Sequence, residues 1–452
     1  MRRILKGKSK SQYRQREIVV IEKIVYEGVG LARLKSGKVV FVDHVVDGEM
    51  VEIELIEEHS DWARGKVLNV VKPSVNRVIP ECPVYAQCGG CNLQHISYEH
   101  QLKIKLENAQ EFFKKWFYPE KIFASPNQFF YRNRLNLQVR GRVGEMKLGF
   151  FKKASHHLVE VKNCKIHMPI LNEASKILQN VLNRWKVHPY NEIKHTGTLR
   201  TLSLRTNPKQ NELLVIFVVR EGHTFGKKQV AKILSRKLGV KVGVFENTNP
   251  KKTNVIFGNK TSHVVGLENM TVNYPKLGIS YAVPPLAFFQ VNYPVAARML
   301  EITKEFLKEA DYVWDLYCGI GFLSLPLEAK ILGIDEVNDS IRAAKYMAKS
   351  MGKKAIFYTA DVAKAAPKFL EKFGKPNAVI LDPPRAGVKR ETLELILEKI
   401  KPKKILYSSC KPSTLRRDLE IITSYGYNVT YMEVLDMFPQ THHFEVVTCL
   451  QI

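Results

Sequence analysis

The first part of the chain alternates short apolar runs with turn-forming residues. Between residues 16 and 71 these runs lie in the segments EIVVIEKIV, KVVFVDHVV, EMVEIELIEE and ARGKVLNVV, and Gly and Asp separate them in EGVG, KSGK and DGE. Several short strands at this close spacing predict a small closed β-barrel of the OB type. Barrels of this kind either bind RNA or serve as spacers, and the pattern fits both.

The middle of the chain predicts one helix and a sheet. Apolar residues recur at helical spacing in QLKIKLENAQEFFKKWF, so we expect an amphipathic helix over about residues 98–118. Residues 129–161 and 198–225 alternate apolar and polar positions, which indicates an antiparallel sheet.

The first of these two sheet segments is rich in basic residues. They are Arg132, Arg134, Arg140, Arg142, Lys147, Lys152 and Lys153. Tyr131, Phe150 and Phe151 lie among them, and basic side chains interleaved with aromatic rings predict a surface that faces RNA. An ordinary half-buried sheet with charged outer positions has the same pattern.

From about residue 274 onward, short apolar runs alternate with stretches of helical period. The runs are YVWDLY, KILGID, AIFYTA, NAVILD and KILYSS, and the helical stretches include VNDSIRAAKYMAKSMG and KRETLELILEKIK. This alternation predicts a parallel, doubly wound α/β sheet. The last segments, NVTYMEVLDMF and HFEVVTCLQI, predict a closing antiparallel pair of strands.

The charge of the chain points to a polyanionic partner. Lys and Arg number 70 and Asp and Glu 44, so the formal net charge is +26. A positive field of this size favours nucleic acid, although a basic surface that only confers solubility has the same charge. The length of 452 residues is enough for about two to four domains.

The cysteines suggest a metal or cluster site rather than disulfides. The chain has 7 cysteines, an odd number, and Cys82, Cys88 and Cys91 lie close together in sequence. This pattern in a long chain predicts a reducing compartment.

The N-terminus lacks the apolar region of a signal peptide, and no apolar run approaches membrane-spanning length. We therefore expect a cytoplasmic protein without a membrane partner.

Polar or glycine-containing residues follow each of the five apolar runs in the C-terminal part. The first run leads into DLYCGIG, whose glycines allow a nucleotide-like group to approach the backbone. Asp335, Asp361 and Asp382 follow the next three runs, and Ser409 and Cys410 follow the fifth. Because ligands bind outside the carboxyl ends of parallel strands, these residues are expected to line one site.

These residue types predict an adenosine-containing cofactor. Asp335 suits the two hydroxyl groups of a ribose, and Asp361 can accept a hydrogen bond from the amino group of adenine. The motifs of dinucleotide-binding proteins and of P-loop NTPases are missing after the first run. S-adenosylmethionine is the best remaining candidate.

Cys410 is the candidate nucleophile. It follows a buried strand, and Pro412 suits the first turn of a following helix. A thiol at a helix N-terminus close to Lys411, Arg416 and Arg417 is expected to have a lowered pKa. A buried structural cysteine is the ordinary alternative, and Cys318 and Cys449 fit it.

A nucleophilic cysteine beside a methyl donor suggests methylation of a pyrimidine. Addition of a thiolate to C6 of uracil or cytosine makes C5 nucleophilic, and C5 then takes the methyl group. A base must remove the C5 proton before the thiolate leaves. Glu445, on the closing strand pair, is the plausible base, and a surface carboxylate on an edge strand is the alternative.

Four motifs resemble those of the RNA uracil-5-methyltransferases, and they occur in the same order: WDLYCGIG, LDPPRAGV, YSSCKPSTLRRDL and FPQTHHFEVV. CPVYAQCGGCNLQH resembles the iron–sulfur motif of that family, and the N-terminal barrel looks like its TRAM domain. The resemblance covers nearly the whole chain.

The resemblance implies a role for each candidate residue. It makes Cys410 the nucleophile and Glu445 the proton acceptor. It places S-adenosyl-L-methionine against Gln290, Tyr317, Asp335, Asp361 and Asp382. It makes Cys82, Cys88, Cys91 and Cys164 the ligands of a [4Fe–4S] cluster. From the spacing alone, zinc is also possible, with His95 and His167 completing the site.

Two positions depart from the family pattern. Phe322 stands where Asn or Thr is usual, and Asp335 replaces the more frequent Glu. The first leaves one cofactor contact open, whereas the second keeps a carboxylate.

The predicted architecture is multidomain. We expect a basic N-terminal tail over residues 1–14 and an OB-like TRAM barrel over residues 15–74. An α+β central domain that carries the iron–sulfur cluster and binds RNA follows over residues 75–272. The last part, residues 273–452, is expected to be a Rossmann-like class I methyltransferase domain, on which the helix at about 98–118 can pack.

The expected protein is a monomer that methylates uridine at C5 in RNA. Large-subunit (23S) ribosomal RNA is the first choice of substrate, and a uridine of the tRNA T-loop is the second. A cytosine-5-methyltransferase and a non-catalytic iron–sulfur protein that binds RNA and senses redox state are the alternatives.

Overall fold

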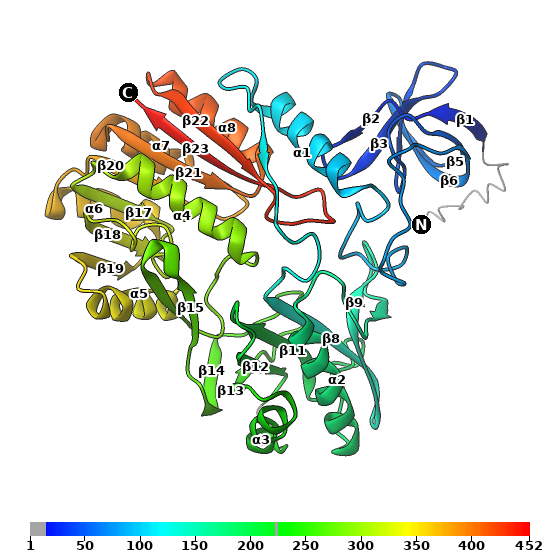
Figure 1. The fold of residues 1–452 in the computed structure, drawn as a ribbon, viewed down its shortest axis with the longest axis horizontal. Coiled ribbons are helices and arrows are strands. Elements are labelled where there is room, and N and C mark those ends of the chain that lie inside the picture. The colour runs from blue at the N-terminus through cyan, green and yellow to red at the C-terminus, as the bar shows by residue number, and fades with distance from the viewer. Residues whose placement is uncertain (1–14, 222–224) are drawn as a thin grey trace, which may run out of the picture.

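The computed structural model describes residues 15–221 and 225–452, and the predicted basic tail over residues 1–14 lies outside the described residues. Figure 1 shows three parts: an N-terminal sheet, a central sheet, and a C-terminal sheet covered by helices. The long helix α1 lies between the N-terminal and C-terminal sheets.

The N-terminal part is a six-stranded sheet in the order β1-β5-β6-β4-β3-β2. Its strands are β1 (Arg16–Val20), β2 (Lys23–Val25), β3 (Val29–Arg33), β4 (Val39–Val42), β5 (Met50–Glu58) and β6 (Trp62–Lys72). Alternate residues such as Val40, Val42, Val51 and Ile53 are fully buried in its core. The strands predicted from the alternating pattern are confirmed.

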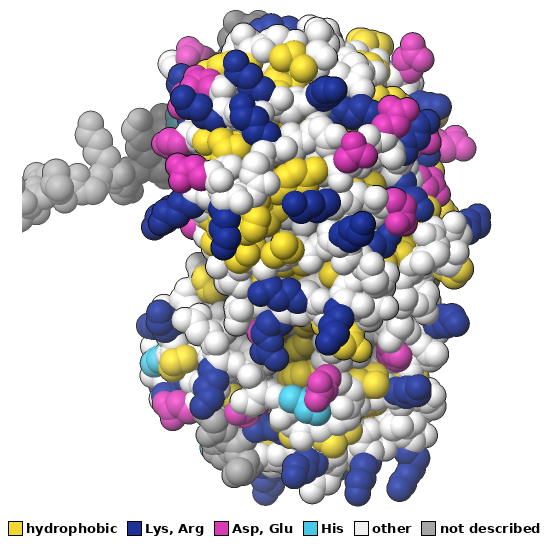
Figure 2. Space-filling view, turned by 90° about the vertical axis from the view of Figure 1, so that its left-hand side faces the viewer, with side chains coloured by type: hydrophobic (Ala, Val, Ile, Leu, Met, Phe, Trp, Pro, Cys, Tyr) yellow, Lys and Arg dark blue, Asp and Glu magenta, His cyan; other side chains and the backbone are white. Residues whose placement is uncertain are grey.

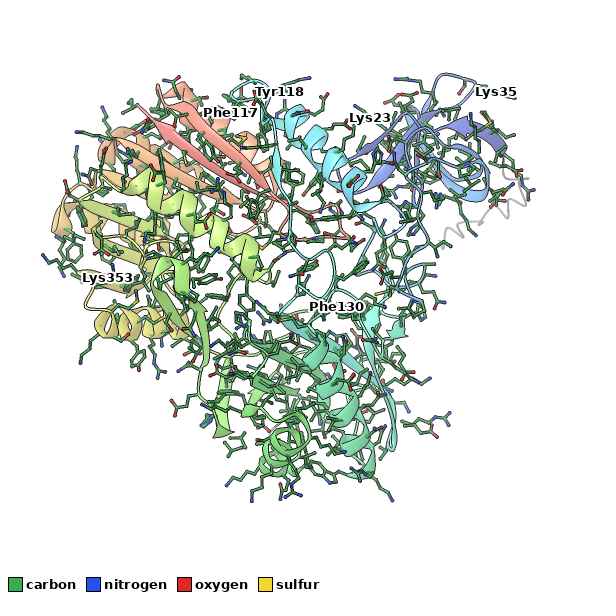
Figure 3. The ribbon with its side chains drawn as sticks, in the orientation of Figure 1. Lys23, Lys35, Phe117, Tyr118, Phe130 and Lys353 are labelled. Atoms are coloured by element: carbon green, nitrogen blue, oxygen red, sulfur yellow. The ribbon has the colours of Figure 1, made fainter. Side chains whose placement is uncertain are left out.

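Helix α1 (Tyr98–Phe113) connects the barrel to the C-terminal sheet. Asn108 donates to the carbonyl oxygen of Ile24 in the barrel at 3.1 Å. Beyond the helix end, the indole of Trp116 donates to Thr423 of α8 (Pro412–Ser424) at 3.1 Å. Figure 3 shows Phe117 and Tyr118 at this end of the helix and Lys23 on the barrel side. The helix ends five residues earlier than predicted.

The central sheet has seven strands in the order β10-β9-β8-β11-β12-β13-β14. They are β8 (Arg134–Arg142), β9 (Glu145–Phe151), β10 (Leu158–Glu160), β11 (Leu199–Thr206), β12 (Glu212–Val219), β13 (Lys241–Thr248) and β14 (Lys260–Gly266). Helices α2 (Pro169–Arg184) and α3 (Lys227–Leu238) pack against it. The predicted antiparallel pairing is correct for β8, β9, β11 and β12, whereas β12 and β13 are parallel because α3 crosses between them.

The C-terminal sheet has eight strands in the order β19-β18-β17-β20-β21-β23-β22-β7. They are β7 (Ile122–Phe123), β17 (Tyr312–Leu316), β18 (Lys330–Asp335), β19 (Ala355–Thr359), β20 (Ala378–Leu381), β21 (Lys404–Ser409), β22 (Asn428–Leu435) and β23 (Glu445–Gln451). The five strands β17 to β21 are parallel, and β22 and β23 close the sheet as an antiparallel pair. Both predictions are confirmed.

Helices cover this sheet, and a hairpin precedes it. The hairpin consists of β15 (Met270–Tyr274), the short helix η1 (Pro275–Leu277) and β16 (Ile279–Val283). The helices are α4 (Tyr293–Leu307), α5 (Asn338–Ser350), α6 (Val362–Phe373), α7 (Arg390–Glu394), the π-helical turn η2 (Leu395–Ile400) and α8 (Pro412–Ser424). In the ranges that the structure describes, none of the helices combines the length and the apolar character needed to span a bilayer.

Lys and Arg side chains are spread over the face shown in Figure 2, with Asp and Glu among them and a band of hydrophobic side chains exposed between them. The positive charge on this face is therefore not gathered into one patch. The charge on this face alone therefore does not indicate where a polyanion would bind.

Candidate active site

The pairing of β21 with β23 brings Cys410 and Glu445 to the same end of the sheet. The two strands are antiparallel, and Ser409 is paired with Val446. Cys410 directly follows Ser409, and Glu445 directly precedes Val446, so the two side chains are neighbours across the strand pair. Residues 35 positions apart in the chain thus lie at one end of the sheet.

The thiol of Cys410 is half-buried, and its pKa is raised to about 11. Burial is the main cause, the charge of Glu445 adds to it, and Arg385 partly opposes both. The prediction of a lowered pKa is therefore wrong. Helix α8 does begin at Pro412, as expected, but the positive end of a helix is outweighed by desolvation here.

The basic residues expected to act on Cys410 are not among the main causes of its pKa shift; these residues are Lys411, Arg416 and Arg417. Arg417 instead donates to the carboxylate of Asp418 at 2.8 Å and to the carbonyl oxygens of Ala386 and Val388 at 3.1 Å. Arg385 is the cation that faces the thiol.

Glu445 is buried, and its pKa is raised to about 8. Burial is the main cause and the neighbouring Asp382 is the second, whereas the Ser408 hydroxyl, which donates to Oε1 of Glu445 at 2.9 Å, lowers the pKa. The pKa of Asp382 is raised to about 7, also mainly by burial. A buried carboxyl group with a pKa near neutrality suits a proton acceptor.

The loop after β17 and the end of β18 form a cradle for a nucleotide-like group. Oδ2 of Asp335 accepts the N–H of Gly319 at 2.9 Å, and its Oδ1 accepts that of Val337 at 2.8 Å. Tyr317 has a φ of +67° and Gly321 a φ of +76°, so the chain turns sharply here. The predicted Tyr317 and Asp335 therefore lie together at the carboxyl end of the sheet.

Asp361 and Gln290, two further predicted cofactor residues, form hydrogen bonds within the protein. Asp361 caps α6 by accepting the N–H of Lys364 at 3.0 Å, and Lys389 donates to its other oxygen at 3.2 Å. Gln290 is buried, and its carbonyl oxygen accepts a bond from Asn133 at 2.8 Å. Asp361 thus lies beyond β19 as expected, and Gln290 comes from the segment before α4.

Phe322 belongs to an aromatic cluster, which explains its departure from the family pattern. Its ring lies 5.2 Å from that of Phe289 and 5.5 Å from that of Tyr281. The hydroxyl of Tyr281 donates to the carbonyl oxygen of Phe322 at 2.6 Å. An aromatic residue therefore fills space in the core at this position, where a polar residue is usual.

Sequence reasoning missed several residues around Cys410. Tyr26 of the barrel lies near it, and burial, followed by the charge of Cys410, raises the pKa of Tyr26 to about 12. Its ring contacts those of His442 and Phe444 at 5.2 and 5.8 Å. No sequence signal predicts that the barrel reaches the site, whereas Arg385 stands in the recognised motif LDPPRAGV.

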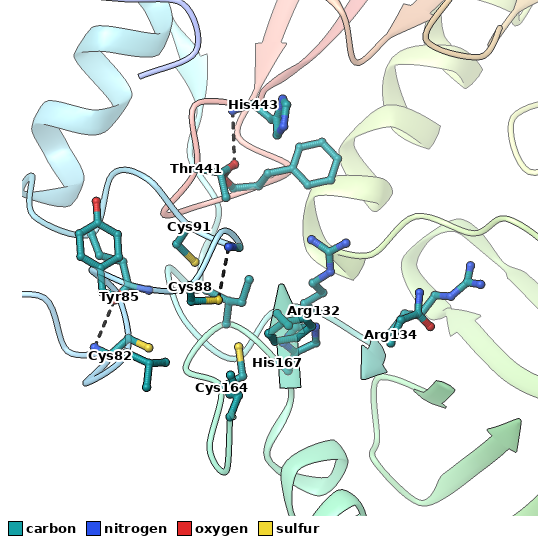
Figure 4. A pocket seen from close by; sticks show the side chains of 18 of the residues that line it. Cys82, Tyr85, Cys88, Cys91, Arg132, Arg134, Cys164, His167, Thr441 and His443 are labelled. Atoms are coloured by element: carbon teal, nitrogen blue, oxygen red, sulfur yellow. Dashed lines mark hydrogen bonds between the residues drawn. The ribbon is translucent and has the colours of Figure 1, made fainter. Parts of the chain in front are cut away.

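The four predicted cluster cysteines line one cavity, of about 320 Å³. Figure 4 shows Cys82, Cys88 and Cys91 on one loop, with Cys164 facing them from another segment of the chain. Burial raises the pKa of Cys91 and of Cys164 to about 12, and the other thiols add to both shifts. The structure thus brings together residues 73 positions apart in the chain.

A zinc site completed by His95 does not fit the geometry. Within the described residues, no three or more His, Cys, Asp or Glu side chains are placed to hold one metal ion. His95 is also unsuited, because one ring nitrogen bonds to Tyr85 at 2.7 Å and the other to the carbonyl oxygen of Val45 at 2.9 Å. The zinc alternative that used His95 is therefore wrong.

The cysteine cavity extends toward Cys410. Arg385 and His443 line it together with the cysteines and with Arg132, Arg134 and His167. Among the described residues, Nε of Arg134 and Nδ1 of His167 and of His443 are buried without a hydrogen-bond partner. Three residues that line the cavity therefore have a buried nitrogen without a hydrogen-bond partner.

Part of the predicted RNA-facing set is engaged within the protein. Arg140 pairs with Glu192 at 2.8 Å, and Lys153 pairs with Asp43 of the barrel at 2.9 Å. Phe150 stacks on His167 beside the cysteine cavity.

Comparison with known proteins places this site in a family. The sequence model of the "tRNA (Uracil-5-)-methyltransferase" family matches residues 97–357 and 364–451, and that of the TRAM domain matches residues 10–68. Proteins described as uncharacterized RNA methyltransferases are similar along nearly the whole length. One from Clostridium tetani is 32% identical over 93% of both chains, and one from Bacillus anthracis is 34% identical over 98% of both.

A solved structure has the same fold. It is the Pyrococcus abyssi tRNA (uracil-54, C5)-methyltransferase in complex with S-adenosyl-L-homocysteine, with a TM-score of 0.78. The sequences are 26% identical, and the match covers 96% of this chain and 99% of that one. Fold and site thus define an RNA methyltransferase that uses S-adenosylmethionine. The chain belongs to the tRNA (uracil-5-)-methyltransferase family and has an N-terminal TRAM domain.

Proposed function

We propose that this protein methylates a uridine of RNA at C5 through a covalent adduct of Cys410. The observation that carries this proposal is the meeting of Cys410 and Glu445 across the β21–β23 pair, beside Arg385 and next to the cradle of Tyr317 and Asp335. A nucleophile, a buried carboxyl group and a cofactor cradle are the three parts that this reaction needs.

The reaction begins when the Cys410 thiolate forms a bond to C6 of the uracil. The electrons of the C5–C6 double bond move toward O4, and C5 becomes nucleophilic. S-adenosylmethionine, when bound, supplies the methyl group that C5 takes up. Glu445 then accepts the C5 proton, the double bond forms again, and the Sγ–C6 bond breaks.

The protonation states in the pocket must change before the reaction can run. Cys410 has to lose a proton although burial raises its pKa to about 11, and Glu445 has to be ionised although its pKa is about 8. Arg385 faces both groups and lowers the pKa of each. A bound cofactor with a positive sulfonium group would act in the same direction.

The cofactor would lie between Gln290, Tyr317, Asp335, Asp361 and Asp382, at the carboxyl ends of the parallel strands. Asp335 keeps its carboxylate fixed by two backbone N–H groups and still has lone pairs for ribose hydroxyls. Asp361 is partly engaged by Lys389, so adenine recognition there would require that contact to loosen.

The cysteine site fits a [4Fe–4S] cluster held by Cys82, Cys88, Cys91 and Cys164. Four thiols around one cavity are the ligand set that such clusters use. We propose a structural role for it, since the methyl transfer involves no net oxidation or reduction.

The target uridine would be flipped out of its stack into the pocket, because C5 and C6 are inaccessible in a helix. Large-subunit ribosomal RNA is our first choice of substrate, on the resemblance to related enzymes with both a barrel and a cluster. Uridine 54 of tRNA is the second candidate, favoured by the named target of the Pyrococcus abyssi structure.

The deciding experiment maps 5-methyluridine in total RNA from cells with and without this protein. A lost methyl group in 23S rRNA or in tRNA identifies the substrate, and loss of 5-methylcytidine instead would overturn the uridine assignment. Cys410→Ala serves as the control that tests catalysis. If this variant methylates RNA at the wild-type rate, the covalent mechanism is wrong. If the wild-type protein methylates no RNA, a non-catalytic RNA-binding redox sensor becomes the better explanation of its function.

A further inference from the structure

Asn92 follows Cys91 directly and joins the barrel to the loop that precedes Glu445. Its Nδ2 donates to the carbonyl oxygen of Glu27 in the barrel at 2.7 Å and bonds to Nδ1 of His442 at 2.8 Å. Its Oδ1 accepts the backbone N–H of His442 at 2.9 Å. Both polar atoms of this side chain are therefore used in linking other parts of the chain.

The backbone around Asn92 makes the same connection. The N–H groups of Asn92 and Leu93 donate to the carbonyl oxygen of Gln440 at 3.2 and 3.1 Å. Gln440 has a φ of +69°, which residues other than glycine rarely adopt, so its contacts must hold it there. Gln101 of α1 contributes two of them, through amide–amide and amide–backbone bonds of 3.0 and 3.1 Å.

The barrel approaches Asn92 too closely for any residue but glycine. Gly28 has a φ of +71°, and a Cβ atom there would lie 2.6 Å from Nδ2 of Asn92. The neighbouring Tyr26 packs its ring against His442. The turn of residues 26–28, the cysteine loop and residues 438–444, which we call the catalytic loop, thus meet at one side chain.

The catalytic loop determines how the active site is shaped. It leads directly into Glu445, and its His443 lines the cysteine cavity together with Arg385, which faces Cys410. Any shift of the loop would move the proposed base relative to the nucleophile. A displacement of about 1 Å can cost a reaction roughly 100-fold in rate.

We infer that Asn92 is a positioning residue that couples the order of the four-cysteine site to the geometry of the catalytic loop. The inference rests on the proposed function. While the cysteines are held together, Asn92 fixes His442 and the barrel turn at once. When they are released, the loop loses this anchor. Through this anchor, the barrel contributes to catalysis as well as to RNA binding.

Asn92→Ala, compared with Asn108→Ala, tests this inference in the full-length, iron-containing protein. Asn108 also donates to a barrel carbonyl, that of Ile24, and its other bond goes to the carbonyl oxygen of Ile104 in its own helix, so it is a matched control. With RNA containing 5-fluorouridine, we expect the single-turnover rate of adduct formation to fall roughly 10- to 100-fold in Asn92→Ala and less than about twofold in Asn108→Ala. Iron content and S-adenosylmethionine affinity should stay within about twofold of wild type.

Iron removal by a chelator provides the second half of the test. In wild type it should slow adduct formation and speed hydrogen exchange over residues 438–444, whereas in Asn92→Ala it should add little to either effect. Equal slowing of both proteins by the chelator, or equal rates for the two Asn→Ala variants, would overturn the inference. An active wild type that forms no adduct would instead overturn the proposed function. Should Asn92→Ala not fold, Asn92→Asp keeps the acceptor and loses both donor bonds, and the same comparison applies.

Discussion

Ser408 donates its hydroxyl hydrogen bond to Oε1 of Glu445 at 2.9 Å, and it also lowers the pKa of Asp382. One small side chain thus stabilises the ionised forms of two buried carboxyl groups. Ser408→Ala removes this stabilisation, so the pKa of Glu445 rises above its present value of about 8. Because the base must be ionised, less of it is active at pH 7. We expect the rate there to fall about tenfold and the pH–rate profile to move upward.

The matched control for this prediction is Ser409→Ala. Ser409 bonds only to the backbone of Lys411 among the contacts of its hydroxyl in the described chain. Its removal should leave the pH–rate profile where it is. A profile that is identical in wild type and Ser408→Ala would show that Glu445 does not limit the rate.

Glu445→Gln separates the two halves of the reaction. The amide keeps the size of the side chain but cannot accept the C5 proton, so addition and methyl transfer proceed while elimination stalls. We expect methylated RNA to accumulate on Cys410, with turnover reduced about 10²- to 10⁴-fold. Gel shifts under denaturing conditions, followed by mass spectrometry of the linked peptide, measure the adduct. Free 5-methyluridine at the normal rate would assign the base to another residue.

The raised pKa of Cys410 predicts slow alkylation in the free enzyme. With a pKa of about 11, few molecules carry the thiolate at pH 7, and the rate with iodoacetamide should rise steadily up to about pH 10. S-adenosylmethionine carries a positive sulfonium group and S-adenosylhomocysteine does not, although their shapes are similar. At equal occupancy, the first should therefore speed alkylation relative to the second. No difference between them would exclude electrostatic activation by the cofactor.

The fold was largely predictable because its signals are local. Apolar runs and helical periods fixed the five parallel strands, the closing pair and α1, since each depends on residues near one another in sequence. The parallel pairing of β12 with β13 was missed, because β13 lies outside the two segments predicted to form the sheet and α3 separates it from β12.

The sequence predicted candidate residues but not their surroundings. Cys410 and Glu445 were chosen from their places on the predicted strands and then matched to the family motifs, and the pKa of Cys410 was misjudged because desolvation depends on neighbours far apart in sequence. The same reason hid Tyr26 and Asn92, whose roles arise from how the barrel and the cysteine loop pack against the catalytic loop. Asn92 stands within the motif CPVYAQCGGCNLQH, but nothing in the sequence marks its contacts or those of Tyr26.

The ion pair between Lys105 of α1 and Asp436 is buried, with a distance of 2.5 Å between Nζ and Oδ1. Asp436 also accepts the Tyr98 hydroxyl at 2.8 Å, so Lys105→Ala leaves a buried carboxylate with one partner fewer. We expect a loss of about 3–5 kcal/mol in the free energy of unfolding, measured by urea denaturation.

Lys103→Ala is the control, because Lys103 makes an exposed pair with Glu107 worth less than about 1 kcal/mol. Lys105→Met combined with Asp436→Leu should be more stable than Lys105→Ala, since no unpaired charge remains. Equal stability of Lys105→Ala and Lys103→Ala would mean that water reaches Asp436 and that α1 is not held to the C-terminal sheet by this pair.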